Sequence, residues 1–162
     1  MPHRGNPTFR TLDRSECDAL LARNQVGRLA YAFHGRVDIE PIHYVFADDA
    51  IYMRTEPGSK LATLAHAPWV AFEVDEIDGP FDWQSVVAHG SVYVLEDEGT
   101  PETRTKYTAA VSRLRELMPD ALGDNDPVPA RRVVLKLYPA EVTGREAHLS
   151  YPDVRDSLTE EP

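Results

Sequence analysis

The sequence predicts a mainly β fold with peripheral helices, built as a small antiparallel barrel of six or seven strands. Short runs rich in β-branched and aromatic residues recur along the chain, and tight turns such as His34-Gly35 and Asp48-Asp49 join several of them. The strands do not alternate with helices, as they would in a parallel sheet. The chain has 162 residues, of which 42% are hydrophobic, and this is enough for the core of one domain.

Six segments have the composition of β-strands. They are residues 27–33, 36–46, 50–55, 69–76, 83–95 and 132–138, the last of which can continue to about residue 145. Pro41 has no backbone N–H, so it is expected where its strand has an unpaired edge or a bend. Gly90 interrupts the longest strand, so a bulge or a bend is expected there.

Three helices are expected outside the strands. Asp13 and Glu16 have the spacing of a capping box, which starts a helix that continues to about residue 23. Ser59 is expected to cap a short second helix. Thr100-Pro101 combines a hydroxyl cap with proline at the first helical position, so it starts the third helix, and the prolines of residues 119–130 predict a loop after it.

The two ends of the chain differ from the central segment. Residues 1–11 are polar and contain two prolines, so a flexible N-terminal arm is expected there. The barrel is expected over residues 12–147, and residues 148–162 are expected to form a polar C-terminal tail. The sequence therefore predicts one domain between two loosely held ends.

Charge and composition limit the kinds of partner. A formal net charge of -10 repels nucleic acids and anionic membranes, so neither is expected to bind. No apolar run approaches the roughly 20 residues that span a bilayer, and residues 1–7 lack the apolar core of a signal peptide. We therefore expect a cytoplasmic protein. Cys17 is the only cysteine, which excludes an internal disulfide, and it is expected to pack as a small apolar side chain.

One short stretch gathers the groups that bind a phosphate. Arg54 and Thr55 end a predicted strand, and Ser59 and Lys60 start the helix that follows. A helix N-terminus offers unpaired N–H groups and a partial positive charge, and arginine makes paired hydrogen bonds to phosphate oxygens. Taken singly, these residues are ordinary surface residues. Together they are a candidate phosphate site, although the chain contains neither a P-loop nor a Gly-x-Gly-x-x-Gly motif.

An ordered series of motifs along the chain resembles a known family. The matching pieces are Pro41 to Tyr44, Asp48-Asp49, Ile51 to Thr55, Gly58 to Lys60, Pro68 to Asp75, Trp83 to Gly90 and Thr143-Gly144-Arg145. In this order and spacing they resemble the pyridoxamine 5'-phosphate oxidase-like, FMN-binding split β-barrels, over about residues 12–147. The true oxidases carry a tryptophan followed by arginines near the C-terminus, whereas residues 146–152 contain no tryptophan. The resemblance is therefore to the compact flavin-reductase and nitroimidazole-reductase-like branch.

The resemblance implies a homodimer with an FMN in each groove between the two barrels. The phosphate would be held by Arg54, Thr55, Ser59 and Lys60. The flavin ring would lie along the edge formed by Ile42, His43 and Tyr44. The second subunit would contribute Trp83, Gln84 and Ser85, of which the glutamine and the serine would bind the polar edge of the flavin.

The same resemblance implies an FMN-dependent oxidoreductase. A reduced nicotinamide cofactor would supply electrons, a small organic molecule or oxygen would accept them, and His43 or Tyr44 would bind the substrate or the ring. No side chain is required as a nucleophile, because the flavin carries the redox chemistry. One alternative is a reductase that uses the deazaflavin F420, and another is a non-catalytic module that binds flavin, or heme through His43 or His89. The six histidines show no metal-ligand spacing, so no protein-bound metal is expected.

Overall fold

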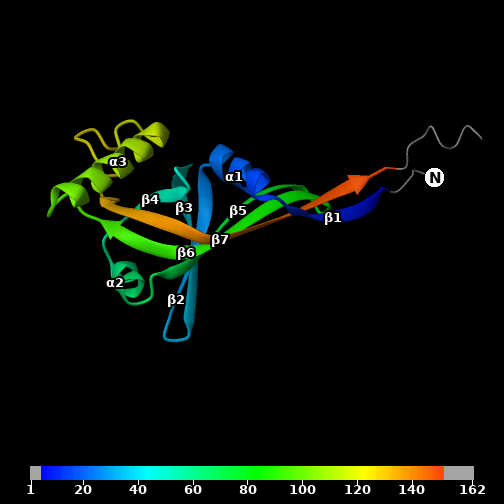
Figure 1. Cartoon of the computed structure of the whole chain (residues 1–162), viewed down its shortest axis with the longest axis horizontal. Helices are drawn as coiled ribbons and strands as arrows, with labels where there is room; N and C mark the ends of the chain where they lie inside the picture. The colour runs from blue at the N-terminus through cyan, green and yellow to red at the C-terminus, as the bar shows by residue number, and fades with distance from the viewer. Residues whose placement is uncertain (1–4, 152–162) are drawn as a thin grey trace, which may run out of the picture.

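A computed structural model describes residues 5–151 as seven strands and three helices (Figure 1). The elements in chain order are β1 (Asn6–Leu12), α1 (Arg14–Arg23), β2 (Val26–Phe33), β3 (Arg36–Ala47), β4 (Ala50–Thr55), α2 (Ser59–His66), β5 (Trp69–Gly79), β6 (Asp82–Leu95), α3 (Pro101–Leu117) and β7 (Val133–Ser150). The strand order is β1-β7-β4-β3-β2-β5-β6, all neighbours are antiparallel, and an additional β6–β7 pairing closes the barrel. The predicted fold class, a mainly β split barrel with three helices, is confirmed.

The two predicted hairpin turns are present. His34 and Gly35 have φ values of 51° and 78°, and Asp48 and Asp49 have values of 53° and 56°. Two consecutive residues with positive φ are typical of the two-residue turns that match the twist of antiparallel strands. These turns set the register of β2 against β3 and of β3 against β4. Pro41 lies in β3 opposite Arg28, before the pairing with β4 begins at Tyr44, so its missing N–H interrupts no ladder on that side.

Strand β7 holds the molecule together. It pairs with β4 through its first residues, with β1 through its last residues, and with β6 along most of its length. The β6–β7 register shifts at His89/Gly90, which confirms the predicted bulge. A methyl group at Gly90 would overlap the carbonyl oxygen of Tyr138, so the strands can approach this closely only because residue 90 has no side chain.

The core fills the barrel, and α1 packs against it. The predicted capping box is present, since the Asp13 carboxylate accepts from Glu16 N and the Glu16 carboxylate accepts from Asp13 N. Cys17, Leu20 and Leu21 are buried in the core. Cys17 is thus the packed apolar side chain that was expected, and burial raises the pKa of its thiol.

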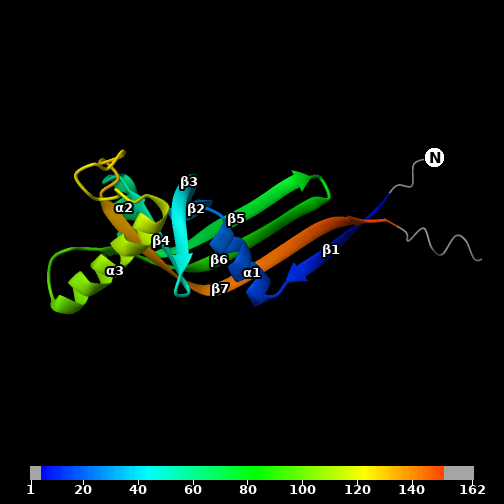
Figure 2. The same ribbon diagram turned by 90° about the horizontal axis from the view of Figure 1, so that it is seen from above.

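The other two helices lie at the opposite end of the molecule from β1 (Figure 2). Helix α3 buries Ala110, Val111 and Leu114 in a second cluster with residues of β4 and β7. Helix α2 starts differently from the prediction. Its N-cap is Gly58, which forms no side-chain cap bond, and Ser59 is the first helical residue. The expected Ser59 cap is therefore wrong. Gly58, with an extended backbone, occupies the cap position, so the hydroxyl of Ser59 lies one residue inside the helix.

The N-terminal segment differs from the flexible arm that composition predicts. Residues 6–12 form β1, which pairs with residues 144–150 of β7, so that β7 also runs past residue 147. The pairing depends on backbone hydrogen bonds to β7. Residues 6–12 are mostly polar and include a proline, so their composition does not predict a strand there. Residues 1–4 and 152–162, the rest of the two predicted ends, lie outside the described residues. Within residues 5–151 no helix is long and apolar enough to cross a bilayer.

Candidate functional site

A polar pocket lies where β4 ends and α2 begins. It has a volume of about 430 Å³. Its walls are Tyr31, Glu40, Pro41, Ile42, Arg54, Thr55, Glu56, Pro57, Gly58, Ser59, Lys60 and Arg131. Five residues that the sequence predicts as cofactor ligands therefore line one cavity: Ile42, Arg54, Thr55, Ser59 and Lys60.

The start of α2 adds hydrogen-bond donors to this pocket. The cap residue, Gly58, has no side chain to occupy the first N–H groups of the helix. The N–H of Leu61 donates to the carbonyl oxygen of Gly58 at 3.1 Å. This leaves the N–H groups of Ser59 and Lys60 available, and the helix dipole favours negative charge in front of them. Lys60, in the first turn, donates a hydrogen bond of 2.8 Å to Thr55 Oγ1 and forms an ion pair with Glu40. A phosphate at this position would meet a lysine, a hydroxyl and backbone donors.

Arg54, near the end of β4, is held in place by an ion pair with Asp126. Its side chain is 8% exposed, and its two terminal nitrogens bind the carboxylate of Asp126, with Nη2 at 3.0 Å from Oδ1. Nη2 also lies 2.9 Å from Met118 Sδ. The bonds from Arg54, together with backbone N–H groups, hold the pKa of Asp126 well below its usual range. Arg54 is thus held in a buried ion pair at the wall of the pocket.

The charges that line the pocket nearly cancel. Arg54, Lys60 and Arg131 contribute three positive charges, and Glu40 and Glu56 contribute two negative ones. The carboxylate of Asp126, which pairs with Arg54 at the wall, adds a third negative charge, so the charges at the pocket balance in a chain whose formal net charge is -10. Tyr31 adds a phenol at the wall, and burial raises its pKa so that it remains a neutral hydrogen-bond donor. The hydrogen-bond donors of the pocket therefore suit an anion with polar groups attached.

Two predicted ligands on β3 do not line this pocket. Tyr44 is 1% exposed, and its hydroxyl donates a hydrogen bond of 2.6 Å to the carbonyl oxygen of Leu21. Burial raises the pKa of this phenol. His43 points to the opposite face of the strand, where it is exposed. Tyr44 holds α1 on the barrel, and the role predicted for His43 stays a prediction.

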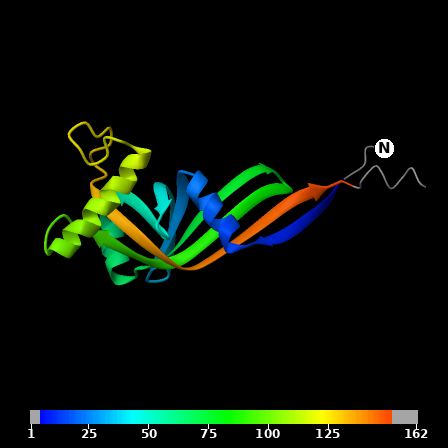
Figure 3. The ribbon, with the colours of Figure 1, turned by 45° about the horizontal axis from the view of Figure 1, so that its top comes forward.

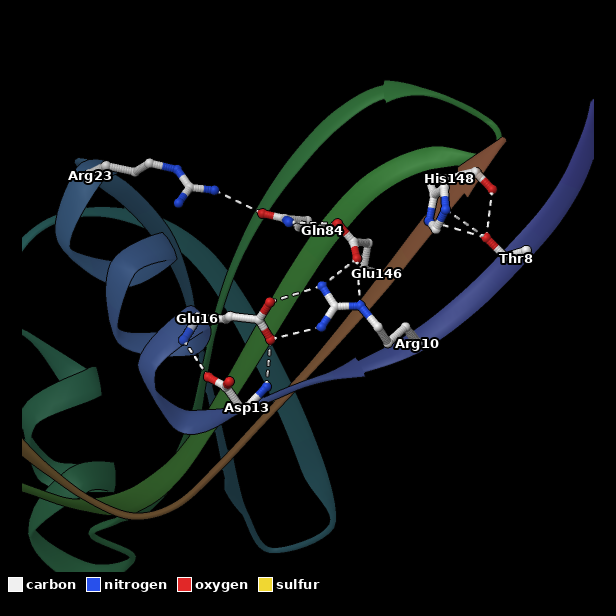
Figure 4. Close-up of polar contacts among 8 residues, drawn as sticks. All are labelled: Thr8, Arg10, Asp13, Glu16, Arg23, Gln84, Glu146 and His148. Carbon is white, nitrogen blue, oxygen red and sulfur yellow. Dashed lines mark hydrogen bonds and ion pairs between the residues drawn. The ribbon is translucent and has the colours of Figure 1, made fainter. Parts of the chain in front are cut away.

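The three residues predicted to serve the second subunit lie on the arm formed by β5, β6, β7 and β1, away from α2 (Figure 1). None of them lines the pocket of its own chain. Gln84 points toward α1, where its amide accepts from Arg23 at 2.8 Å and donates to Glu146 at 2.9 Å (Figure 4). Ser85 points the other way and donates to Glu73 at 3.2 Å.

Gln84 belongs to a polar network that joins the arm to α1 (Figure 4). Arg10 of β1 binds both Glu16 of α1 and Glu146 of β7, with nitrogen–oxygen distances of 2.9 and 2.6 Å. The bonds from Arg10 hold the pKa of Glu16 below the usual range, and the hydrogen bonds from Gln84 and Arg10 do the same for Glu146. Because both ends of the Gln84 amide have partners in this network, Gln84 can bind a ligand only by giving up one of them.

The outer face of the sheet carries large exposed apolar side chains. Val37 and Ile39 of β3 are 71% and 67% exposed. Trp69, Tyr93 and Tyr138 continue this face across β5, β6 and β7, because their positions alternate with the buried residues of each strand. The three aromatic residues also line a hollow of about 660 Å³.

The polar residues at the pocket that were not predicted are Tyr31, Glu40, Glu56 and Arg131 on its lining, and Asp126 behind Arg54. Glu40 directly precedes the motif of Pro41 to Tyr44, but only the fold brings it to Lys60. Asp126 and Arg131 belong to the segment expected only to be a loop, and 72 residues separate Asp126 from Arg54. The one local signal is the proline after Asp126, which marks a turn and gives no partner.

The chain is similar to proteins of one family. Residues 13–146 match the family described as pyridoxamine 5'-phosphate oxidase. An uncharacterized protein of Rhizobium meliloti is 25% identical over 150 residues, which cover 93% of this chain and 92% of that protein. The crystal structure of a FAD-binding protein from Mesorhizobium loti has a TM-score of 0.64 and 28% identity, covering 85% of this chain and 96% of that one.

A FAD and heme binding protein of Mycobacterium smegmatis has the same TM-score of 0.64 at 17% identity, covering 91% of this chain and 78% of that one, so its likeness concerns the fold alone. The family match spans residues 13–146 of the 162 and so covers α1 and strands β2 to β6 together with most of β7. The chain belongs to the pyridoxamine 5'-phosphate oxidase-like family.

Proposed function

We propose that the protein is an FMN-dependent oxidoreductase that uses a reduced nicotinamide cofactor to reduce a small organic molecule or oxygen. The observation that carries the proposal is the pocket at the start of α2, where Lys60, Thr55 and free helix N–H groups face one cavity in a strongly acidic chain. Membership of the family and a relative named as a FAD-binding protein support a flavin as the ligand.

The residues of the pocket fit the phosphate end of such a cofactor. Lys60, Thr55 and the backbone N–H groups at Ser59 would hold the phosphate, with Arg54 at the wall and Ile42 beside the chain that leads to the ring. A bound flavin accepts and donates electron pairs, so the protein need only bind, orient and shield it. The acceptor would enter from the open side of the pocket.

The cofactor site would be completed by a second copy of the chain. The outer sheet face that carries Val37, Ile39 and Trp69 has no helix over it within residues 5–151, and an exposed apolar face of this kind is typical of a subunit interface. A homodimer through this face would bury it. It would also let Trp83 and Ser85 of one arm approach the pocket of the other subunit.

A second candidate is a non-catalytic module that binds heme or flavin. The observation in its favour is His89, whose Nδ1 is the one buried side-chain polar atom without a hydrogen-bond partner in the part of the chain described. Such an atom calls for a ligand or partner. The absorbance spectrum of the purified protein distinguishes the possibilities, because flavin, the deazaflavin F420 and heme absorb at different wavelengths.

Replacing one residue tests the flavin site. Lys60→Ala should weaken FMN binding by roughly tenfold or more, since it removes a charged hydrogen-bond donor to phosphate. Arg113→Ala is the control, because Arg113 is a cation of α3 that pairs with Asp48 and Glu116 and does not line the pocket. Titration of flavin fluorescence measures both affinities, and reduction of the bound flavin by a reduced nicotinamide cofactor tests the activity. Equal FMN affinity in the two variants would sink the assignment.

A further inference from the structure

The loop of residues 118–132 connects α3 to β7 and reaches the proposed cofactor pocket. It stands beside the C-terminal end of α3, where it is the yellow segment of Figure 3. The loop is built around one carboxylate, that of Asp126, whose side chain is only 3% exposed. A carboxylate buried to this degree in a connecting loop needs a structural or functional reason.

Asp126 accepts hydrogen bonds from both directions. The backbone N–H groups of Leu122 and Val128 donate to it at 2.8 and 2.9 Å, which holds the loop in its turn. Its two oxygens also bind the terminal nitrogens of Arg54 on β4. The carboxylate thus joins the loop to the strand that forms the wall of the pocket.

This pairing leaves Arg54 poorly placed to bind phosphate. Both of its terminal nitrogens already bind a carboxylate that two backbone groups hold in place. A phosphate at Arg54 would have to displace that carboxylate and leave it buried without a counter-charge, which is strongly unfavourable. The buried pair is better suited to fixing the position of the loop.

The same loop brings a different arginine to the pocket. Arg131 lies five residues after Asp126, lines the cavity beside Lys60, and is exposed. Its backbone N–H donates to the carbonyl oxygen of Val128 at 3.0 Å, so its position depends on the turn that Asp126 holds. None of the ion pairs within residues 5–151 involves Arg131. Its guanidinium is therefore available for a bidentate contact with an anion.

We propose that Arg131 is the arginine that binds the cofactor phosphate, and that Asp126 is a positioning residue which anchors the loop to Arg54 and so places Arg131. This inference rests on the proposed flavin site and changes which arginine serves it. Arg54 then acts as the anchor on the strand, although it belongs to the motif that resembles the family.

The first test compares FMN with riboflavin, which differs from FMN only in lacking the phosphate. Arg131→Ala should weaken FMN binding by roughly ten- to a hundredfold, as expected for a hydrogen-bonded charge, and leave riboflavin binding unchanged. The matched control is Arg132→Ala, since Arg132 is the exposed neighbour that does not line the pocket. It should bind both flavins as the wild type does.

The second test separates positioning from general destabilisation. Asp126→Asn keeps the size of the side chain but weakens the pair with Arg54, so it should lower FMN affinity and leave riboflavin affinity near the wild-type value. In the double variant Asp126→Asn/Arg131→Ala, the asparagine should add little to the loss caused by the alanine, because Asp126 acts through Arg131. Loss of riboflavin and FMN binding in equal measure would instead mean that Asp126 only maintains the fold, and would overturn its positioning role.

The experiments distinguish failure of the proposed flavin site from failure of the role proposed for Arg131. Wild-type protein that binds neither FMN nor FAD would overturn the proposed flavin function and this inference with it. Wild-type protein that binds FMN, together with an Arg131→Ala variant of equal affinity, would overturn the inference alone. Additive losses in the double variant would show that Asp126 affects FMN binding independently of Arg131, and would overturn the positioning role of Asp126.

Discussion

At the scale of single residues, the pocket shows that a charged side chain near a cavity is not automatically a free ligand. Lys60 has the position and the neighbours expected of a phosphate ligand, yet it forms an ion pair with Glu40 in the same pocket. A phosphate must therefore compete with a carboxylate already present. We therefore expect Glu40 to lower the affinity of the pocket for anions.

Removing this competition should strengthen phosphate binding. Glu40→Gln leaves Lys60 without a charged partner, and we expect FMN affinity to rise by about threefold or more, the size of effect typical of a partly exposed ion pair. Isothermal titration calorimetry with FMN measures the change. Glu56→Gln is the control, since Glu56 lines the pocket and forms no ion pair within residues 5–151. An unchanged or lower affinity in Glu40→Gln would contradict the competition.

At the scale of elements, β7 decides how the strands close around the core. The strand pairs with three others, and the bulge beside Gly90 lets it bend as it passes from the barrel to the arm. Tyr138 and Pro139 pack against the bare backbone of Gly90, where no side chain fits. Correct closure therefore depends on one glycine in the middle of a long strand.

Gly90→Ala should destabilise the protein by about 1–3 kcal/mol, because the added methyl group overlaps the backbone of Tyr138 and a strand must shift to admit it. Urea unfolding monitored by tryptophan fluorescence measures the free energy of unfolding. Gly58→Ala serves as the comparison, since a side chain there would meet nothing within 4 Å and the backbone is extended. Equal stabilities of the two variants would show that β6 and β7 adapt without strain.

At the scale of the whole molecule, the helices cover some surfaces and leave another bare. Helix α3 packs against β4 and β7, and α1 packs against the face of the sheet on which Gln84 lies. Within the described part of the chain, the outer face of β3, β2 and β5 carries no helix (Figures 1 and 2). That face exposes Val37 and Ile39 on the β2–β3 hairpin, before the pairing of β3 with β4 begins. We infer from this that the complete cofactor site belongs to a dimer.

A charge on the bare face should separate the subunits. Ile39→Glu places a carboxylate in the proposed interface and should weaken dimerisation by roughly a hundredfold or more, since a buried unpaired charge is costly. Sedimentation velocity measures the oligomeric state, and FMN affinity should fall in parallel. Phe33→Glu is the matched control, because Phe33 is exposed on the opposite face and packs near His66. A wild-type protein that sediments as a monomer would refute the proposed dimer.

The sequence by itself determined the elements and the outline of the site. Turn residues at 34–35 and 48–49, the capping box at Asp13 and Glu16, and the strand–helix step at residues 54–60 are local signals, since each depends on neighbours a few residues away. For this reason six of the seven strands, the three helices and five of the ten predicted ligands, which line one pocket, could be read from the chain.

Only the tertiary structure decided how those groups are used. It paired Lys60 with Glu40 and Arg54 with Asp126, brought Arg131 to the pocket, turned Tyr44 into the core, and ordered residues 6–12 against the end of β7. Each of these contacts joins residues 20 or more positions apart. Local sequence patterns carry no record of such contacts, because their energies arise only when folding brings distant charges and backbone groups together and removes them from water.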